Sequence, residues 1–72
     1  MNAVKHERFV RIATARVEAL IRDFDKLGRC SAKESYEYTP EEVEKIFAEI
    51  DRQLIRLRDR FEGRDRFVLN KD

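Results

Sequence analysis

TPEEVEKIFAEIDRQLIRLRDRFE, residues 39–62, is the stretch of the sequence that decides the fold. Thr39 predicts a helix N-cap, because its hydroxyl can accept a hydrogen bond from a free backbone N–H of the first turn. Glu42 stands three residues further on, which is the spacing of a capping box. Pro40 falls at the first helical position, where its missing N–H costs nothing. We therefore expect a helix that begins at Pro40.

Apolar residues recur at helical spacing along this stretch. With gaps of 4, 3, 4, 3 and 4 residues, they are Val43, Phe47, Ile50, Leu54, Leu57 and Phe61. At about 3.6 residues per turn they form one stripe, which we call the second stripe. Gly63 can take the left-handed conformation that ends a helix, so the helix is expected over residues 40–62.

A matching stripe precedes it. With gaps of 3, 4, 3, 4 and 3 residues, its members are Val10, Ala13, Val17, Leu20, Phe24 and Leu27. We call this the first stripe. Asn2 is a candidate N-cap, and Gly28 is the expected left-handed stop. A second helix is therefore predicted over about residues 3–28.

The segment between the helices, RCSAKESYEY, residues 29–38, carries no helical stripe. A connection of about ten residues permits two consecutive helices to lie antiparallel. We expect an all-α fold in which residues 1–72 form one helical-hairpin domain, with the two stripes facing each other as in a coiled coil.

The composition of the 72 residues limits the class of protein. Charged residues make up 43% and hydrophobic residues 42%, which suits one small helical domain and is too apolar and too periodic for disorder. A single cysteine, Cys30, excludes an intramolecular disulfide. The longest apolar runs are short, such as FVL, so neither a secretory segment nor a membrane helix is expected. These features predict a cytoplasmic protein.

Some large apolar residues fall outside the stripes. Ile12 and Ile55 lie well off them at ~100° per residue, and the tail after Gly63 contains Phe67, Val68 and Leu69. A hairpin buries one seam, so a second apolar surface favours a homodimer with a four-helix core. The predicted dimer or partner surface is Ile12, Ile55, Phe67 and Leu69. The alternative is a monomer whose tail folds over its own hairpin.

The charges separate along the expected hairpin. Residues 1–18 and 50–72, at its open end, carry a net charge of +4, and residues 19–49 carry −3. A nucleic-acid surface at the open end would use Arg8, Arg11, Arg52, Arg56, Arg60, Arg64 and Arg66. Acidic residues such as Asp59 and Glu62 interleave with these arginines. A solvated, internally paired face is therefore the favoured interpretation.

Residues that could carry catalysis are few. His6 is the one histidine, lies near the first stripe, and has no cysteine at metal-ligand spacing. Cys30 follows Arg29 but has no histidine or second cysteine near it in the sequence. The two glycines form no phosphate-binding loop. We expect no catalytic, cofactor-binding or metal site, and hence no enzyme.

The run from Leu27 to Phe61 carries a resemblance. A Leu-Gly-x-Cys-Ser turn, at residues 27–31, precedes a Tyr-x-Tyr-Thr helix start and a Val-x-x-Ile-Phe-x-x-Ile seam. This half of the chain resembles small uncharacterised helical proteins of bacterial conjugative elements and phages. It departs from them at Arg29 and Ala32, where they often have asparagine. The resemblance implies a cytoplasmic bacterial protein and carries over no catalytic residue.

Two functions from different classes remain open. The first is a non-enzymatic helical interaction module, accessory or regulatory in a mobile element, that binds itself and a larger protein. The second is a small nucleic-acid-binding protein that uses the arginine-rich end. Salt separates them, because phosphate contacts weaken steeply as salt rises and apolar helix contacts do not.

Overall fold

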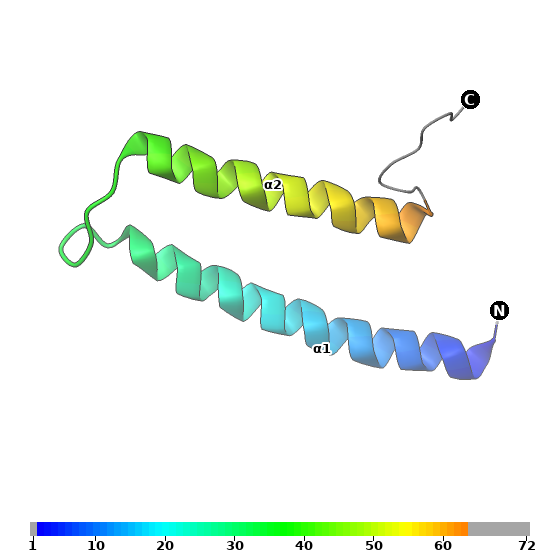
Figure 1. The fold of residues 1–72 in the computed structure, drawn as a ribbon. Coiled ribbons are helices and arrows are strands. Elements are labelled where there is room, and N and C mark those ends of the chain that lie inside the picture. The colour runs from blue at the N-terminus through cyan, green and yellow to red at the C-terminus, as the bar shows by residue number, and fades with distance from the viewer. Residues whose placement is uncertain (1, 64–72) are drawn as a thin grey trace, which may run out of the picture. The chain divides into compact units, whose positions relative to one another are not determined.

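The structure is a computed structural model that describes residues 2–63. Helix α1 runs from Ala3 to Gly28, a short 3₁₀ helix, η1, from Arg29 to Ser31, and helix α2 from Pro40 to Glu62 (Figure 1). Within that range the chain contains no strand. The all-α class is confirmed, and so are the predicted helix bounds of 3–28 and 40–62.

The start of α1 is held by Asn2. Its side-chain Oδ1 accepts a hydrogen bond from the Lys5 N–H at 2.9 Å, and its carbonyl accepts one from the His6 N–H at 2.9 Å. The side-chain bond satisfies one of the free N–H groups of the first turn, and the carbonyl bond is the first regular bond of the helix. The predicted cap at Asn2 is confirmed.

The end of α1 differs from the prediction. Gly28 has φ −60° and ψ −29°, which is right-handed, so the left-handed stop expected there is wrong. The chain instead tightens into η1, whose i to i+3 bonding satisfies late carbonyl groups without a left-handed residue. Extended backbone resumes at Ala32, with φ −70° and ψ 108°.

The connection between the helices contains a turn at residues 33–35, shortly after η1. The Ala32 carbonyl accepts hydrogen bonds from the Ser35 N–H at 3.1 Å and the Tyr36 N–H at 2.9 Å. Residues 36–39 then run without regular structure into α2. The helix is therefore interrupted between α1 and α2, as a hairpin requires.

The start of α2 is a complete capping box. The Thr39 hydroxyl accepts from the Glu42 N–H at 3.1 Å, and the Thr39 N–H donates to Glu42 Oε1 at 2.8 Å. At the other end Gly63 has φ 76° and ψ 15°, and its N–H bonds the Asp59 carbonyl. Both ends of α2 confirm the prediction.

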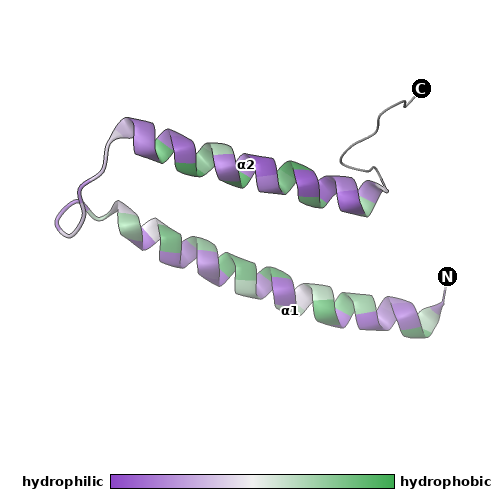
Figure 2. Cartoon of the chain, viewed as in Figure 1, coloured by the Kyte–Doolittle hydropathy of each residue, from purple (hydrophilic) through white to green (hydrophobic). Residues whose placement is uncertain are grey.

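The chain divides into two units, Met1–Glu37 and Tyr38–Asp72, each built on one helix. Both helices carry hydrophobic and hydrophilic residues interspersed along their length (Figure 2). No residue of residues 2–63 is buried, so neither helix has a core of its own. The packing of the two helices as one domain, and their dimerisation, stay predictions.

Candidate interaction surfaces

The apolar face of α1 is the first stripe. Its members leave large fractions of their side chains accessible, with Phe24 50% exposed. Ala13 is half-buried. At ~100° per residue the six members lie within about 100° of one another around the helix. The face is thus a continuous apolar strip along most of α1.

The apolar face of α2 is the second stripe. Phe47 is 58% exposed and Phe61 70% exposed, whereas Val43 and Ile50 are half-buried. The stripe runs from the first turn of α2 to its last, and its six members lie within about 80° of one another. Two bulky aromatic rings and four aliphatic side chains therefore form one strip of surface.

The predicted dimer surface is described only in part. Ile12 is 37% exposed and Ile55 58% exposed. Each lies about 110–120° from the centre of the stripe on its own helix, as the sequence predicted. Phe67 and Leu69 lie outside the described residues. For the predicted dimer surface, the structure therefore establishes only that Ile12 and Ile55 lie off the stripes and are exposed.

Phe9 belongs to the apolar face of α1 and was missed from the sequence. It is 52% exposed. It lies one turn before Ala13 and about 50° from the centre of the first stripe, so it extends that stripe towards the N-terminus of α1. Its i to i+4 relation to Ala13 was the available signal, and a strict 3-4 spacing counted from Val10 skips it.

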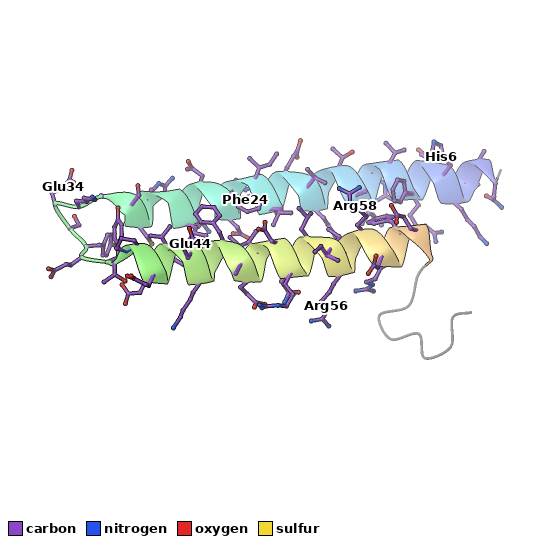
Figure 3. The ribbon with its side chains drawn as sticks, turned by 90° about the horizontal axis from the view of Figure 1, so that it is seen from above. His6, Phe24, Glu34, Glu44, Arg56 and Arg58 are labelled. Carbon is purple, nitrogen blue, oxygen red and sulfur yellow. The ribbon has the colours of Figure 1, made fainter. Side chains whose placement is uncertain are left out.

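The predicted arginine surface spans both units. Arg8 and Arg11 lie on α1, and Arg64 and Arg66 lie outside the described residues. On α2, Arg52, Arg56 and Arg60 follow one another at i, i+4 and i+8, so they share a face away from the apolar stripe. In Figure 3 Arg56 and Arg58 leave α2 on opposite sides. The structure thus groups three of the predicted arginines in one row.

Acidic groups accompany this row. Arg52 pairs with Glu49 one turn before it, and the same carboxylate accepts a hydrogen bond from Gln53 Nε2 at 2.6 Å. Asp59 lies between Arg56 and Arg60 in the sequence and is half-buried. The row is therefore a face of mixed charge.

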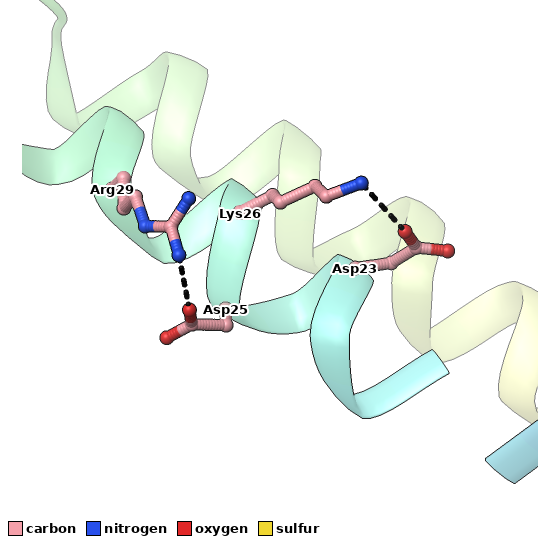
Figure 4. A network of polar contacts seen from close by, with 4 residues as sticks. All are labelled: Asp23, Asp25, Lys26 and Arg29. Atoms are coloured by element: carbon pink, nitrogen blue, oxygen red, sulfur yellow. Dashed lines mark hydrogen bonds and ion pairs between the residues drawn. The ribbon is translucent and has the colours of Figure 1, made fainter. Parts of the chain in front are cut away.

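Ion pairs also close the last turns of α1 (Figure 4). Arg29 Nη2 lies 2.7 Å from Asp25 Oδ2, and Lys26 Nζ lies 3.9 Å from Asp23 Oδ1. All four side chains are about 70% exposed, so water screens the pairs, and each contributes about 0.3–0.5 kcal/mol at most. They stabilise the helix end and form no binding site.

The candidate chemical groups stay apart. Cys30 is an exposed free thiol in η1, and His6 lies in the second turn of α1, near its N-terminus (Figure 3). In the part of the chain from residue 2 to residue 63, no three His, Cys, Asp or Glu side chains gather as metal ligands would. The same part holds no helix with the length and apolar character needed to cross a bilayer.

Comparison with known proteins adds no relative to this picture. No protein-family model, no curated protein and no solved structure matches the chain.

Proposed function

We propose that this protein is a non-enzymatic helical interaction module that binds a second copy of itself and a larger protein through the apolar faces of α1 and α2. One observation carries the proposal. Each helix has a continuous apolar stripe, and no side chain of either stripe is buried. Amphipathic helices of this kind gain most of their stability from packing those faces against another surface.

The free energy of burying the stripes supports the need for a partner surface. Burying a large apolar side chain fully contributes about 1.5–3 kcal/mol, and each stripe has at least five such residues. A chain of 72 residues supplies only a small core on its own. The stripes are therefore the main source of stability available to this protein, and covering them is what makes the helices persist.

The arrangement we propose is an antiparallel hairpin that dimerises into a four-helix bundle. The interruption between η1 and α2 allows the reversal, and Ile12 and Ile55 offer a second apolar surface outside the stripes. The apolar tail residues Phe67 and Leu69 would extend that surface. The resemblance to proteins of conjugative elements and phages supports an accessory role in a mobile element, in the bacterial cytoplasm.

A nucleic-acid-binding function is the second candidate. The row of Arg52, Arg56 and Arg60 favours it, because guanidinium groups one turn apart can contact successive phosphates. Glu49 weighs against it, since that carboxylate already binds Arg52. The mixed charge of this face makes the interaction module the better-supported function.

Binding to labelled duplex DNA tests the two functions directly. Fluorescence anisotropy would be measured at 50 and 200 mM salt, for the parent and for a variant with Arg52, Arg56 and Arg60 all changed to alanine. The proposal expects no binding that depends on these arginines. Affinity that falls by about tenfold or more over this salt range, and that the triple variant loses, would overturn it in favour of nucleic-acid binding.

A further inference from the structure

The second stripe is symmetric about its centre. Its gaps of 4, 3, 4, 3 and 4 residues are the same in both chain directions, and its centre is residue 52. An antiparallel copy of α2 centred there places an apolar residue opposite every member of the stripe. The pairs across the two copies are Val43 with Phe61, Phe47 with Leu57, and Ile50 with Leu54.

Charge is strongly segregated along α2. Its first half, residues 40–51, has five acidic residues and one lysine, a net charge of −4. Its second half, residues 52–62, has four arginines and two acidic residues, a net charge of +2. An antiparallel second copy sets each half against the half of opposite sign, whereas a parallel copy sets like against like.

Helix α1 does not offer the same match. Its residues 3–15 carry a net charge of +2 and its residues 16–28 carry none. An antiparallel α1 would therefore bring its basic half to the basic half of α2. Of the two neighbours that α2 has in the proposed bundle, the reversed copy of α2 therefore matches its charge pattern better than the reversed α1 of its own hairpin does.

The edge of the second stripe identifies the residues that would meet. Glu44, Asp51 and Arg58 follow one another at seven-residue intervals, so they line one edge of the stripe. In Figure 3 Glu44 and Arg58 leave α2 on the same side, opposite Arg56. In an antiparallel pair this edge meets its own copy in reverse order. Glu44 then faces Arg58 of the second copy, twice per pair.

We infer that the second stripe is a self-association surface on which α2 of a second copy lies antiparallel, about a two-fold axis at residue 52, with Glu44 paired to Arg58 of that copy. The inference rests on the four-helix bundle proposed above, in which α2 has two neighbours, α1 of its own chain and a helix of the second copy. It specifies that this second neighbour is α2, and gives its direction and register. It carries one cost: Asp51 meets Asp51 of the second copy near the axis. Removing that repulsion with Asp51→Asn should tighten association by about two- to threefold.

Charge reversal tests the pairing. Glu44→Arg and Arg58→Glu each turn two attractive pairs into repulsive ones, and each should weaken association by about tenfold. The double variant E44R/R58E restores opposite signs and should recover the parent dissociation constant to within about threefold. Lys45→Glu, on the face away from the stripe, is the control and should leave association unchanged. Sedimentation equilibrium measures all four, with circular dichroism to verify equal helix content. A double variant as weak as the single ones would overturn the pairing.

Spin labels at three positions test direction and register. In a Cys30→Ser background, single cysteines replace Lys45, Arg52 or Asp59, which are seven residues apart and share one face of α2. The antiparallel register puts the two labels at 52 level with each other along the axis, on the opposite outer faces of the pair. It offsets the two labels at 45, or at 59, by about 21 Å along the axis, at ~1.5 Å per residue.

The outcomes of the label experiment are distinct. Pulsed electron–electron distances that are shortest at 52 and longer by similar amounts at 45 and 59 support the inference. Equal distances at all three positions mean a parallel pair, which overturns the inference and leaves the proposed self-association intact. No intermolecular coupling at any position, with a mass of 8.7 kDa in solution, overturns both.

Discussion

At the scale of single residues, the helix ends are where the sequence determines structure most directly. Thr39 and Glu42 exchange two hydrogen bonds, and Gly63 has the positive φ that ends α2. Each of these signals acts through atoms within four residues of chain. They were predictable from the sequence because no distant part of the molecule is needed to satisfy them.

Gly28 shows where residue-scale prediction fails. A glycine after the last apolar residue of a stripe favours a left-handed stop, yet Gly28 stays right-handed at φ −60°. The Arg29 side chain bonds Asp25 across this end at 2.7 Å, and a 3₁₀ turn continues the chain. Glycine permits the left-handed conformation without requiring it, so neighbouring bonds decided the outcome.

The two glycines therefore respond oppositely to alanine. A methyl group at either position meets no atom within 4 Å, so only the backbone matters. Gly28→Ala should stabilise the folded protein by up to about 1 kcal/mol, because alanine favours the right-handed helical conformation. Gly63→Ala should destabilise by about 1 kcal/mol, because φ 76° is strained for alanine. Thermal melts at one protein concentration measure both, and shifts of the same sign would contradict the assignment.

The cap of α2 offers a second test. Thr39→Ala removes the acceptor for the Glu42 N–H and should destabilise by about 1 kcal/mol. Thr39→Ser keeps the hydroxyl and is the matched control, expected within a few tenths of a kcal/mol of the parent. Chemical denaturation followed by circular dichroism provides the comparison. Equal losses for both variants would show that the hydroxyl is not what caps the helix.

At the scale of the element, the apolar stripes determine which face of each helix must be covered but not what covers it. Periodicity depends only on the sequence of one helix. Together with the cap residues and the glycines, it predicted the bounds of α1 and α2. The identity of the covering surface depends on competition between the other helix, a second copy and a different protein. Apolar contacts are non-directional, so spacing alone leaves that competition open. Charge along the edge of the stripe is the feature that favours one of these covering surfaces over the others.

Truncating a stripe residue tests the stripe itself. Phe47→Ala or Leu54→Ala removes bulk from a surface that the proposed assembly would bury, and each should destabilise the protein by about 2–5 kcal/mol. Lys45→Ala, on the opposite face of α2, is the control and should stay within about 0.5 kcal/mol. Unfolding by urea at fixed protein concentration gives the differences. Stripe variants as stable as the control would show that the second stripe is not packed.

At the scale of the whole molecule, the proposed dimer links stability to concentration. Unfolding coupled to dissociation becomes harder as protein concentration rises. Deleting residues 64–72 removes Phe67 and Leu69, and Ile55→Glu places a charge on the other part of the predicted surface. Either change should shift the dimer towards monomer while most helix content remains. Multi-angle light scattering at two concentrations measures the mass.

The control for this prediction is Lys45→Glu, which also introduces a glutamate on α2 but lies on the face away from the apolar stripe. A mass of 8.7 kDa for the parent at both concentrations would rule out the dimer. The tail would then be expected to cover Ile55 of its own chain, because those residues would still need a partner surface.

The self-contained ends of α1 and α2 also set the kinetics of assembly. The caps at Asn2 and Thr39 and the turn at Ala32 each close over at most four residues, so they can form in the time of a helix–coil relaxation, about 0.1–1 μs. In the proposed assembly, the encounter between apolar stripes would then be the slow step. If α1 and α2 fold by binding a second copy, as proposed, the final fold forms at a rate limited by how often two chains meet. The concentration of newly made chains would then determine how long the apolar faces stay exposed.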